Sequence, residues 1–257
     1  MPWVEVVAIF LAGVAAGTIN AVVGSGTLIT FPVLLAFGFP PVVANVSNNI
    51  GLVPGGVTAT LGYRTELGGQ SRNMRLLAPM SLLGAASGAL LLLRLPASAF
   101  EAIVPVLLAI SLVLVVLQPR IQAVVARRRS AAPSPSESGH QRLVMAGTFV
   151  AGVYGGYFGA AQGVLLVGLL GSLLPESLQR VNALKNLLSL VVNLVAALVF
   201  VSVARNHIDW RVVALIAVGS LIGGYLGARY GRRLPPSALR VLIVVVGVVA
   251  IVRVVTG

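Results

Sequence analysis

Ten apolar runs, joined by short polar connections, account for most of this sequence. Their approximate bounds are Val4–Val23, Thr27–Phe37, Pro41–Leu61, Leu76–Leu93, Phe100–Leu117, Leu143–Phe158, Gly163–Leu174, Val181–Val203, Val212–Arg229 and Leu239–Val255. A helix needs about 20 apolar residues to cross a bilayer, so 257 residues accommodate about eight to ten crossings or part-crossings. Only 9% of the residues are charged, where soluble proteins have about 25%. The sequence therefore predicts an all-α integral membrane protein.

The basic residues are explained better by membrane topology than by nucleic-acid binding. The net charge is +12, but the arginines lie mostly between the apolar runs, as positive-inside orientation requires. Arg127–Arg129 is a basic cluster without the interleaved aromatic residues of a nucleic-acid surface. No basic segment precedes the first apolar run, so this run is predicted to be a retained span and not a signal peptide. No nucleic-acid partner is expected.

The composition also argues against catalysis and metal binding. The chain has no cysteine, which excludes disulfides, thiolate metal sites and thiol catalysis. Its acidic residues and histidines lie at the ends of apolar runs or in connections, so no buried acid, histidine cluster or Ser–His pair is expected within the membrane. We therefore expect no enzyme, no cofactor, no metal site and no proton coupling through a buried Asp or Glu.

The apolar runs form two sets of five that match residue by residue. Gly26 matches Gly163 at an offset of 137 (163 − 26), and Asn45-x-x-Asn48-Asn49 matches Asn182-x-x-Lys185-Asn186 at the same offset. At an offset of 139 the matching glycine pairs, which are predicted to allow close helix packing, are Gly13/Gly152, Gly17/Gly156, Gly84/Gly223 and Gly88/Gly227. The predicted domains are a first transmembrane repeat over 1–118, a flexible, basic, Pro/Ser-rich cytoplasmic linker over 119–142, and a second transmembrane repeat over 143–257.

The arginine distribution favours repeats of inverted orientation. If the first two runs of each half form a hairpin that enters and leaves on one side, each half crosses the membrane an odd number of times. With a cytoplasmic linker, thirteen arginines then lie inside, and the four outside are Arg94, Arg205, Arg211 and Arg253. Parallel repeats would place eleven inside and six outside, so positive-inside bias favours the inverted arrangement. Each repeat is expected to contain a broken or re-entrant helix pair and three transmembrane helices, with both termini periplasmic.

Glycines are predicted to interrupt the first helix of each half. The interruptions are Gly24-Ser25-Gly26 and Gly159-Ala160-Ala161-Gln162-Gly163. Glycine is about 1 kcal/mol less favourable than alanine inside a helix, and unwound backbone is tolerated in a membrane only against protein or a water-filled cavity. Transporters use such breaks to direct helix N-termini at an anionic substrate, and here these helices are expected to begin at Thr27 and Val164. Close packing without a ligand is the alternative.

Two polar stripes occupy matching positions in the two halves. They consist of Asn45, Ser47, Asn48 and Asn49 in the first half and of Asn182, Lys185, Asn186, Ser189 and Asn193 in the second. Asn45 and Asn193 are interpreted as helix–helix contacts. Lys185, the one lysine, is expected to contact a ligand, with snorkelling toward the cytoplasmic surface as the alternative. A cation with amide donors and two helix N-termini is suited to a small oxyanion.

These residues resemble the TauE/SafE family of sulfite and organosulfonate exporters, of the 4-toluene sulfonate uptake permease type. The segments that carry the resemblance are Gly17–Leu35, Gly38–Asn48, Gly152–Gly163 and Arg180–Asn186. The resemblance implies a multi-pass permease of the bacterial inner membrane, with sulfite, sulfoacetate, sulfolactate and thiosulfate as candidate substrates. The sequence departs from the family at Ser25, where a glycine is frequent, and at Ser47-Asn48, where a Thr-Ser pair is usual.

The resulting hypothesis is an exporter of small sulfur-containing oxyanions that works by alternating access at a midplane site. The predicted substrate-binding residues are Gly24, Ser25, Gly26, Asn48, Asn49, Gln162, Gly163, Lys185 and Asn186. The expected partners are a sulfite, thiosulfate or organosulfonate anion, the lipid bilayer and, as an open alternative to a monomer, a second copy of the chain in a homodimer. An anion channel, or a permease for another small anionic metabolite, is the alternative function.

Overall fold

The computed structural model describes residues 1–131, 137–231 and 236–256, and every regular element within these ranges is a helix. The elements are α1 (Trp3–Val22), α2 (Thr27–Ala36), α3 (Pro41–Gly62), α4 (Arg64–Leu67), α5 (Ser71–Arg94), α6 (Ala97–Ala131), α7 (Glu137–Tyr157), α8 (Gln162–Leu173), α9 (Leu178–Val203), η1 (Arg205–His207), α10 (Trp210–Tyr230) and α11 (Pro236–Thr256). The longer helices correspond to the ten apolar runs, whereas α4 and η1 lie in connections. The predicted all-α architecture is confirmed.

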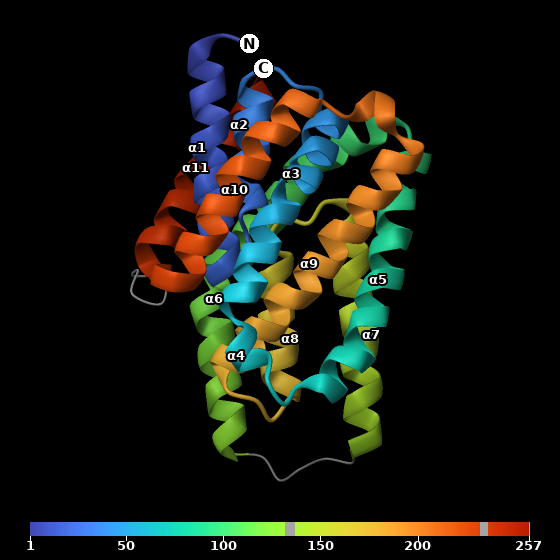
Figure 1. Cartoon of the computed structure of the whole chain (residues 1–257), viewed down its shortest axis with the longest axis vertical. Helices are drawn as coiled ribbons and strands as arrows, with labels where there is room; N and C mark the ends of the chain where they lie inside the picture. The colour runs from blue at the N-terminus through green and yellow to red at the C-terminus, as the bar shows by residue number, and fades with distance from the viewer. Residues whose placement is uncertain (132–136, 232–235, 257) are drawn as a thin grey trace.

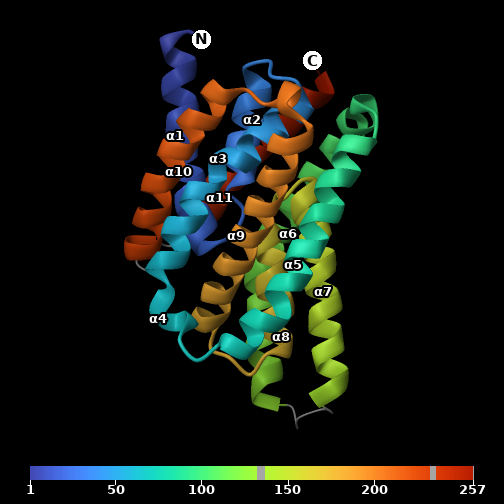
Figure 2. The ribbon, with the colours of Figure 1, turned by 45° about the vertical axis from the view of Figure 1, so that its right-hand side comes forward.

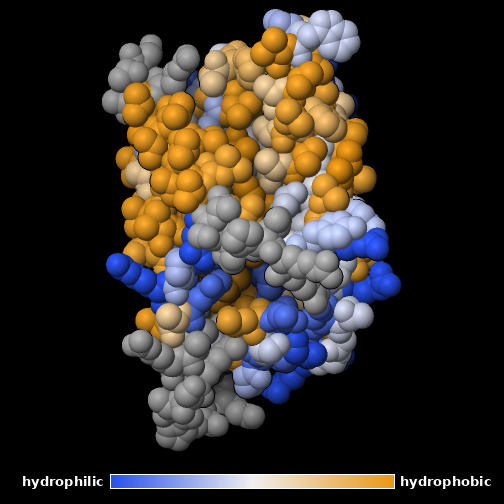
Figure 3. Space-filling model, turned by 90° about the vertical axis from the view of Figure 1, so that its left-hand side faces the viewer, coloured by the Kyte–Doolittle hydropathy of each residue, from blue (hydrophilic) through white to orange (hydrophobic). Residues whose placement is uncertain are grey.

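The exposed surface is that of a multi-pass membrane protein. In the described part of the chain, α1, α5, α6, α9 and α10 contain segments long and apolar enough to cross a bilayer. Large apolar side chains such as Leu83 on α5 and Val106 on α6 are exposed, as expected for a surface that faces lipid. Figure 3 shows one face of the molecule, where hydrophobic residues cover the upper part and hydrophilic residues gather below.

Local sequence signals explain where several helices begin. Pro41 occupies the first position of α3, where its missing N–H is not needed. The Asp209 carboxylate caps α10 by accepting from the backbone nitrogens of Arg211 and Val212, at 2.9 and 3.1 Å. Ser177 caps α9 in the same way by accepting from the backbone nitrogen of Arg180. These caps fix the polar connections at the two ends of the molecule.

The two halves of the chain begin at opposite ends of the molecule. Both termini lie at the upper end in Figure 1, which we call the terminal end, whereas α6 ends and α7 begins at the lower end, the linker end. With 35 residues, α6 is about 52 Å long and exceeds the hydrocarbon thickness of about 30 Å. Within the segment 119–142, which is predicted to be a linker, α6 continues to Ala131 and α7 begins at Glu137, so its described part is helical. Residues 132–136 lie outside the described residues.

Each half packs its first helix against the fourth long helix of the other half. Figures 1 and 2 show α1 beside α10 and α5 beside α7. A Cβ atom on Gly17 of α1 would lie 2.3 Å from the Ser220 carbonyl oxygen of α10. A Cβ atom on Gly156 of α7 would lie 2.2 Å from the Ala85 carbonyl oxygen of α5. The predicted packing role of these glycines is confirmed, and α1 and α7 are held in equivalent surroundings.

Candidate functional site

The two predicted helix breaks are present. Helix α1 ends at Val22, and Gly24 has a φ of +86° before α2 begins at Thr27. Helix α7 ends at Tyr157, and Gly159 has a φ of +80° before α8 begins at Gln162, two residues earlier than expected. Gly24 and Gly159 are therefore the corresponding glycines of positive φ, and they lie 135 residues apart (159 − 24). The sequence pattern had instead matched Gly26 with Gly163, which lie 137 residues apart (163 − 26).

The two breaks contact each other through their backbones. The backbone nitrogen of Gly163 donates a hydrogen bond of 3.0 Å to the carbonyl oxygen of Gly24. A Cβ atom on Gly24 would lie 2.5 Å from the Cα of Gly163, so no side chain fits between them. Both glycines are buried. The expectation that the breaks lie against protein and away from lipid is confirmed.

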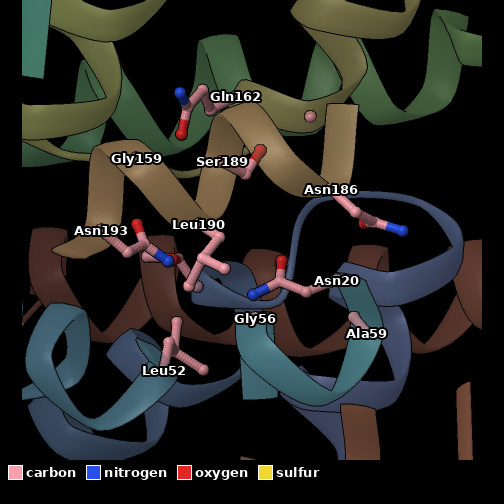
Figure 4. Close-up of a pocket in the computed structure, with 13 residues that line it drawn as sticks. Asn20, Leu52, Gly56, Ala59, Gly159, Gln162, Asn186, Ser189, Leu190 and Asn193 are labelled. Carbon is pink, nitrogen blue, oxygen red and sulfur yellow. The ribbon is translucent and has the colours of Figure 1, made fainter. Parts of the chain in front are cut away.

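A small polar cavity of about 30 Å³ lies where the breaks meet (Figure 4). Its polar or glycine lining residues are Asn20, Gly24, Thr27, Gly56, Gly159, Gln162, Gly163, Asn186, Ser189 and Asn193, and its apolar ones are Leu52, Ala59 and Leu190. The cavity has room for about two water molecules.

Four of the predicted site residues line this cavity, namely Gly24, Gln162, Gly163 and Asn186. Sequence reasoning missed Asn20, Thr27 and Ser189, and it interpreted Asn193 as a helix contact although this residue lines the cavity. A signal was present for the two α9 residues, because Ser189 and Asn193 follow Asn186 at helical spacings of three and seven.

The other predicted residues lie outside the lining. Asn48 bonds to α2, accepting from the Thr30 hydroxyl and donating to Thr27 Oγ1 at 3.3 Å. The Gly26 nitrogen donates to Asn20 Oδ1 at 2.6 Å. The Ser25 hydroxyl and Asn49 Oδ1 are buried without a hydrogen-bond partner.

Lys185 is fully buried beside the cavity and does not line it. Its Nζ donates to the carbonyl oxygens of Asn20 at 2.9 Å and Ala21 at 3.5 Å, at the C-terminal end of α1. The Lys185 side chain runs beside the point where Gly24 and Gly163 meet. Cβ atoms added to these two glycines would lie 3.2 and 2.9 Å from Lys185 Cδ. With an exposed fraction of 0%, Lys185 does not snorkel to the surface, so that alternative is wrong.

Asparagines on the third helix of each half bind the end of the first helix of the other half. Asn182 and Asn186 of α9 donate to the Ala21 carbonyl of α1, at 3.1 and 3.2 Å. Asn45 of α3 donates to the Tyr157 carbonyl of α7 at 2.9 Å. The interpretation of Asn45 as a helix–helix contact is confirmed, and the two halves are joined by equivalent bonds at both breaks.

The electrostatics of the cavity favour a negatively charged or strongly polar guest. The N-cap residues of α2 and α8, Gly26 and Ala161, make no side-chain cap, and the acceptors at these helix starts are the neutral Asn20 amide oxygen, bonded by the Gly26 nitrogen, and the Gly24 carbonyl, bonded by the Gly163 nitrogen. Gln162 Nε2 is a buried donor with no partner. Among the described side chains, the carboxylates lie near helix starts or in connections, on Glu5, Glu66, Glu101, Glu176 and Asp209, and no cluster of metal-binding side chains occurs. The arrangement therefore supplies donors and the positive ends of two helices, with no buried carboxylate among the described side chains.

Comparison with known proteins gives matches along nearly the whole chain. A family model described as "Sulfite exporter TauE/SafE" matches residues 9–254. The "Probable membrane transporter protein YfcA" of Escherichia coli (strain K12) is 28% identical over 94% of this chain and 86% of its own length. A "Probable membrane transporter protein" of Haemophilus influenzae is 26% identical, covering 92% and 89% of the two chains, and "Probable membrane transporter protein ORF9" of Sinorhizobium sp is 27% identical over 95% and 90%. No solved structure matches.

Proposed function

The chain belongs to the sulfite exporter TauE/SafE family and is a membrane transporter, and on this premise we propose that it exports small sulfur-containing oxyanions such as sulfite or organosulfonates. The anion binds in the cavity between the two helix breaks. Gln162, Gly163 and Asn186 line that cavity and belong to the proposed site. We also assign to the site, as an outer layer, Ser25 in the break before α2 and Asn48 and Asn49 of α3, of which Asn48 bonds to the lining residue Thr27.

The observation that carries this proposal is the convergence of two helix N-termini on one cavity. Thr27 begins α2, Gln162 begins α8, and both line the cavity. The partial positive charge at a helix N-terminus makes such ends suited to anions. Gln162 Nε2 adds a buried donor that lacks a partner in the absence of a ligand. A sulfonate or sulfite group presents several acceptor oxygens to such donors.

Alternating access is proposed as the mechanism because the two halves are packed equivalently around the cavity. The α1–α10 and α5–α7 contacts are counterparts, and so are the bonds of Asn182 to α1 and of Asn45 to α7. Inverted repeats that rock about a midplane site generate this kind of pairing. The cavity lies between the two halves, with Asn20 and Gly24 contributed by one and Gln162 and Asn186 by the other. Motion of one half against the other would open it toward one end at a time.

We place the chain in the bacterial inner membrane with both termini periplasmic. The linker end holds α4 and the starts of α5, α7 and α9, whose described arginines are Arg64, Arg72, Arg75, Arg142 and Arg180, and the terminal end holds the end of α5, η1 and the start of α10, whose arginines are Arg94, Arg205 and Arg211. Positive-inside bias makes the linker end cytoplasmic.

Flux measurements on the purified protein in liposomes test this function. We expect saturable efflux of labelled sulfite or thiosulfate that increases when the same anion is supplied on the opposite side. An anion channel would conduct without such trans-stimulation. Flux of sulfite, thiosulfate and sulfoacetate no greater than in protein-free liposomes would refute sulfur oxyanion transport and leave a permease for another anionic metabolite.

A further inference from the structure

The broken helix α1 ends inside the protein and leaves main-chain carbonyl oxygens that its own turns cannot satisfy. The Ile19 carbonyl is bonded by the nitrogens of Val23 and Gly24. The next two carbonyls, of Asn20 and Ala21, must find partners elsewhere. The C-terminal end of a helix carries a partial negative charge, and in transporters with broken helices such ends coordinate the coupling cation.

Here the partner of these carbonyls is the ammonium group of Lys185. The Nζ–O distances are 2.9 Å to Asn20 and 3.5 Å to Ala21, and the side chain has no exposed surface. Asn182 and Asn186 complete the arrangement by donating to the Ala21 carbonyl. The ammonium therefore occupies the place that a free monovalent cation would take at the end of a broken helix.

Charged groups on the elements packed around Lys185 lie away from it in the described residues. Helices α3 and α8 carry none, and α1 carries Glu5 in its first turn, fifteen residues before Asn20. The remaining charged residues of α4, α5, α7 and α9 with described side chains lie in short turns or near helix ends, and they are Arg64, Glu66, Arg72, Arg75, Arg94, Arg142 and Arg180. The carbonyl oxygens are thus the groups that hold the ammonium.

The other half of the chain has no such cation at the equivalent place. The sequence counterpart of Lys185 is Asn48, which bonds to Thr27 and Thr30 of α2 and to no carbonyl at the end of α7. There the Tyr157 carbonyl is satisfied by Asn45. Of the two described breaks, only the one after α1 therefore has a charged side chain bonded to the end of its helix.

We propose that the carbonyl oxygens of Asn20 and Ala21 form a monovalent-cation site that the chain fills with its own Lys185 ammonium, in place of a free coupling cation. Transport then requires no Na⁺ or K⁺. The consequence for transport rests on the function proposed above, whereas the cation site itself does not.

Truncation of Lys185 tests the site directly. Lys185→Ala removes three carbons and the nitrogen, which n-propylammonium replaces atom for atom. We expect a lower Tm for the purified variant and recovery of at least half of that loss by n-propylammonium, with less recovery by methylammonium and none by n-propanol or tetramethylammonium. Asn48→Ala is the matched control, because it truncates the equivalent position where no cation is bound, and n-propylammonium should leave its Tm unchanged. Equal recovery of both variants, or recovery by n-propanol, would overturn the site.

If Lys185→Ala does not fold, a second pair of variants tests the site. Lys185→Met keeps the length of the side chain without the charge, and Lys185→Arg keeps the charge. We expect the Met variant to have the lower Tm of the two, and a Met variant as stable as the wild type would overturn the proposal.

The transport consequence is measured on the wild-type protein, with Na⁺ and K⁺ replaced by N-methylglucamine on both sides of the liposome. Thiosulfate flux should be unchanged, and a tenfold or greater loss would show that a free cation is required and overturn the proposal. Absence of flux under all conditions would refute the proposed function, while the alkylammonium result would still decide whether the cation site exists.

Discussion

The backbone nitrogen of Gly163 lies 3.0 Å from the carbonyl oxygen of Gly24, and this hydrogen bond joins the two helix breaks of the protein. Segments 139 residues apart (163 − 24) thereby meet at one point beside the cavity. The contact requires glycine on both sides, since a Cβ atom on either residue would lie 2.5 Å or less from the other's Cα. The site therefore depends on backbone approach as much as on its polar side chains.

Replacement of Gly24 by alanine is expected to destabilise the protein strongly. The residue has a φ of +86°, which costs a side chain about 1 kcal/mol or more, and the new Cβ would collide with Gly163. Overpacking of this kind adds about 1–3 kcal/mol. The Tm of purified Gly24→Ala, measured in detergent, should fall well below that of the wild type.

Gly38→Ala is the control that separates the two contributions. Gly38 has a similar φ of +82°, but a Cβ atom added there would have no neighbour within 4 Å. It should show the backbone penalty of about 1 kcal/mol alone. Equal losses of Tm in the two variants would mean that the Gly24–Gly163 contact is not close in the purified protein.

Gln162→Leu is expected to weaken anion binding without weakening the fold. Gln162 Nε2 is buried with no partner, and an unsatisfied buried donor costs about 1–3 kcal/mol. Replacement by an apolar side chain removes that penalty, so the Tm should be unchanged or higher. The same change removes a donor to the anion, and loss of one such bond corresponds to about a tenfold rise in Kd. Thiosulfate or sulfite titration of both proteins, together with their Tm values, checks the two effects.

Gln162→Glu sharpens this test, because it places a carboxylate of nearly the same shape in the cavity. Anion flux should then fall below that of the Leu variant. Unchanged flux in both variants would remove Gln162 from the proposed site.

The helices and the breaks were accessible from the sequence because their signals are local. Apolar runs and glycine clusters gave ten helices and two interruptions at nearly the observed places. The residue-by-residue match of the two breaks was wrong, because it paired Gly26 with Gly163. The equivalent glycines are Gly24 and Gly159, which share a positive φ that glycine positions in a sequence do not reveal. The helical ends of the supposed linker were missed because their polar Pro/Ser composition resembles that of an irregular segment.

The site was predictable in part, for a different reason. The sequence placed Gln162, Gly163 and Asn186 near one another, and all three line the cavity. It could not show that Lys185 bonds to the Asn20 and Ala21 carbonyls. Every residue has a main-chain carbonyl, so the residue types do not indicate which carbonyl a side chain binds.

Gln70 is expected to hold the linker end together. Its buried Nε2 donates to the Glu66 carbonyl at 2.8 Å and to the Arg180 carbonyl of α9 at 3.1 Å. Gln70→Leu leaves two carbonyls without this donor but also removes the buried Gln70 Oε1, which has no partner. We therefore expect a net loss of about 1 kcal/mol and faster hydrogen exchange over residues 66–71 and 178–182. Glu176→Gln is the control, because its ion pair with Arg180 is partly exposed and contributes less than about 0.5 kcal/mol. The prediction fails if the control changes stability and exchange as much as Gln70→Leu does.

Single cysteines at the starts of α1 and α7 test the inverted arrangement of the halves. The chain has no native cysteine, so Pro2→Cys and Arg142→Cys each supply the sole thiol. Both positions are exposed and lie at the terminal and linker ends respectively. Positive-inside bias predicts a cytoplasmic linker end, so a membrane-impermeant maleimide added to spheroplasts should label the Pro2→Cys protein at once. The Arg142→Cys protein should react only after permeabilisation. Labelling of both proteins from the outside would contradict the inverted arrangement, because parallel halves begin on the same side of the membrane.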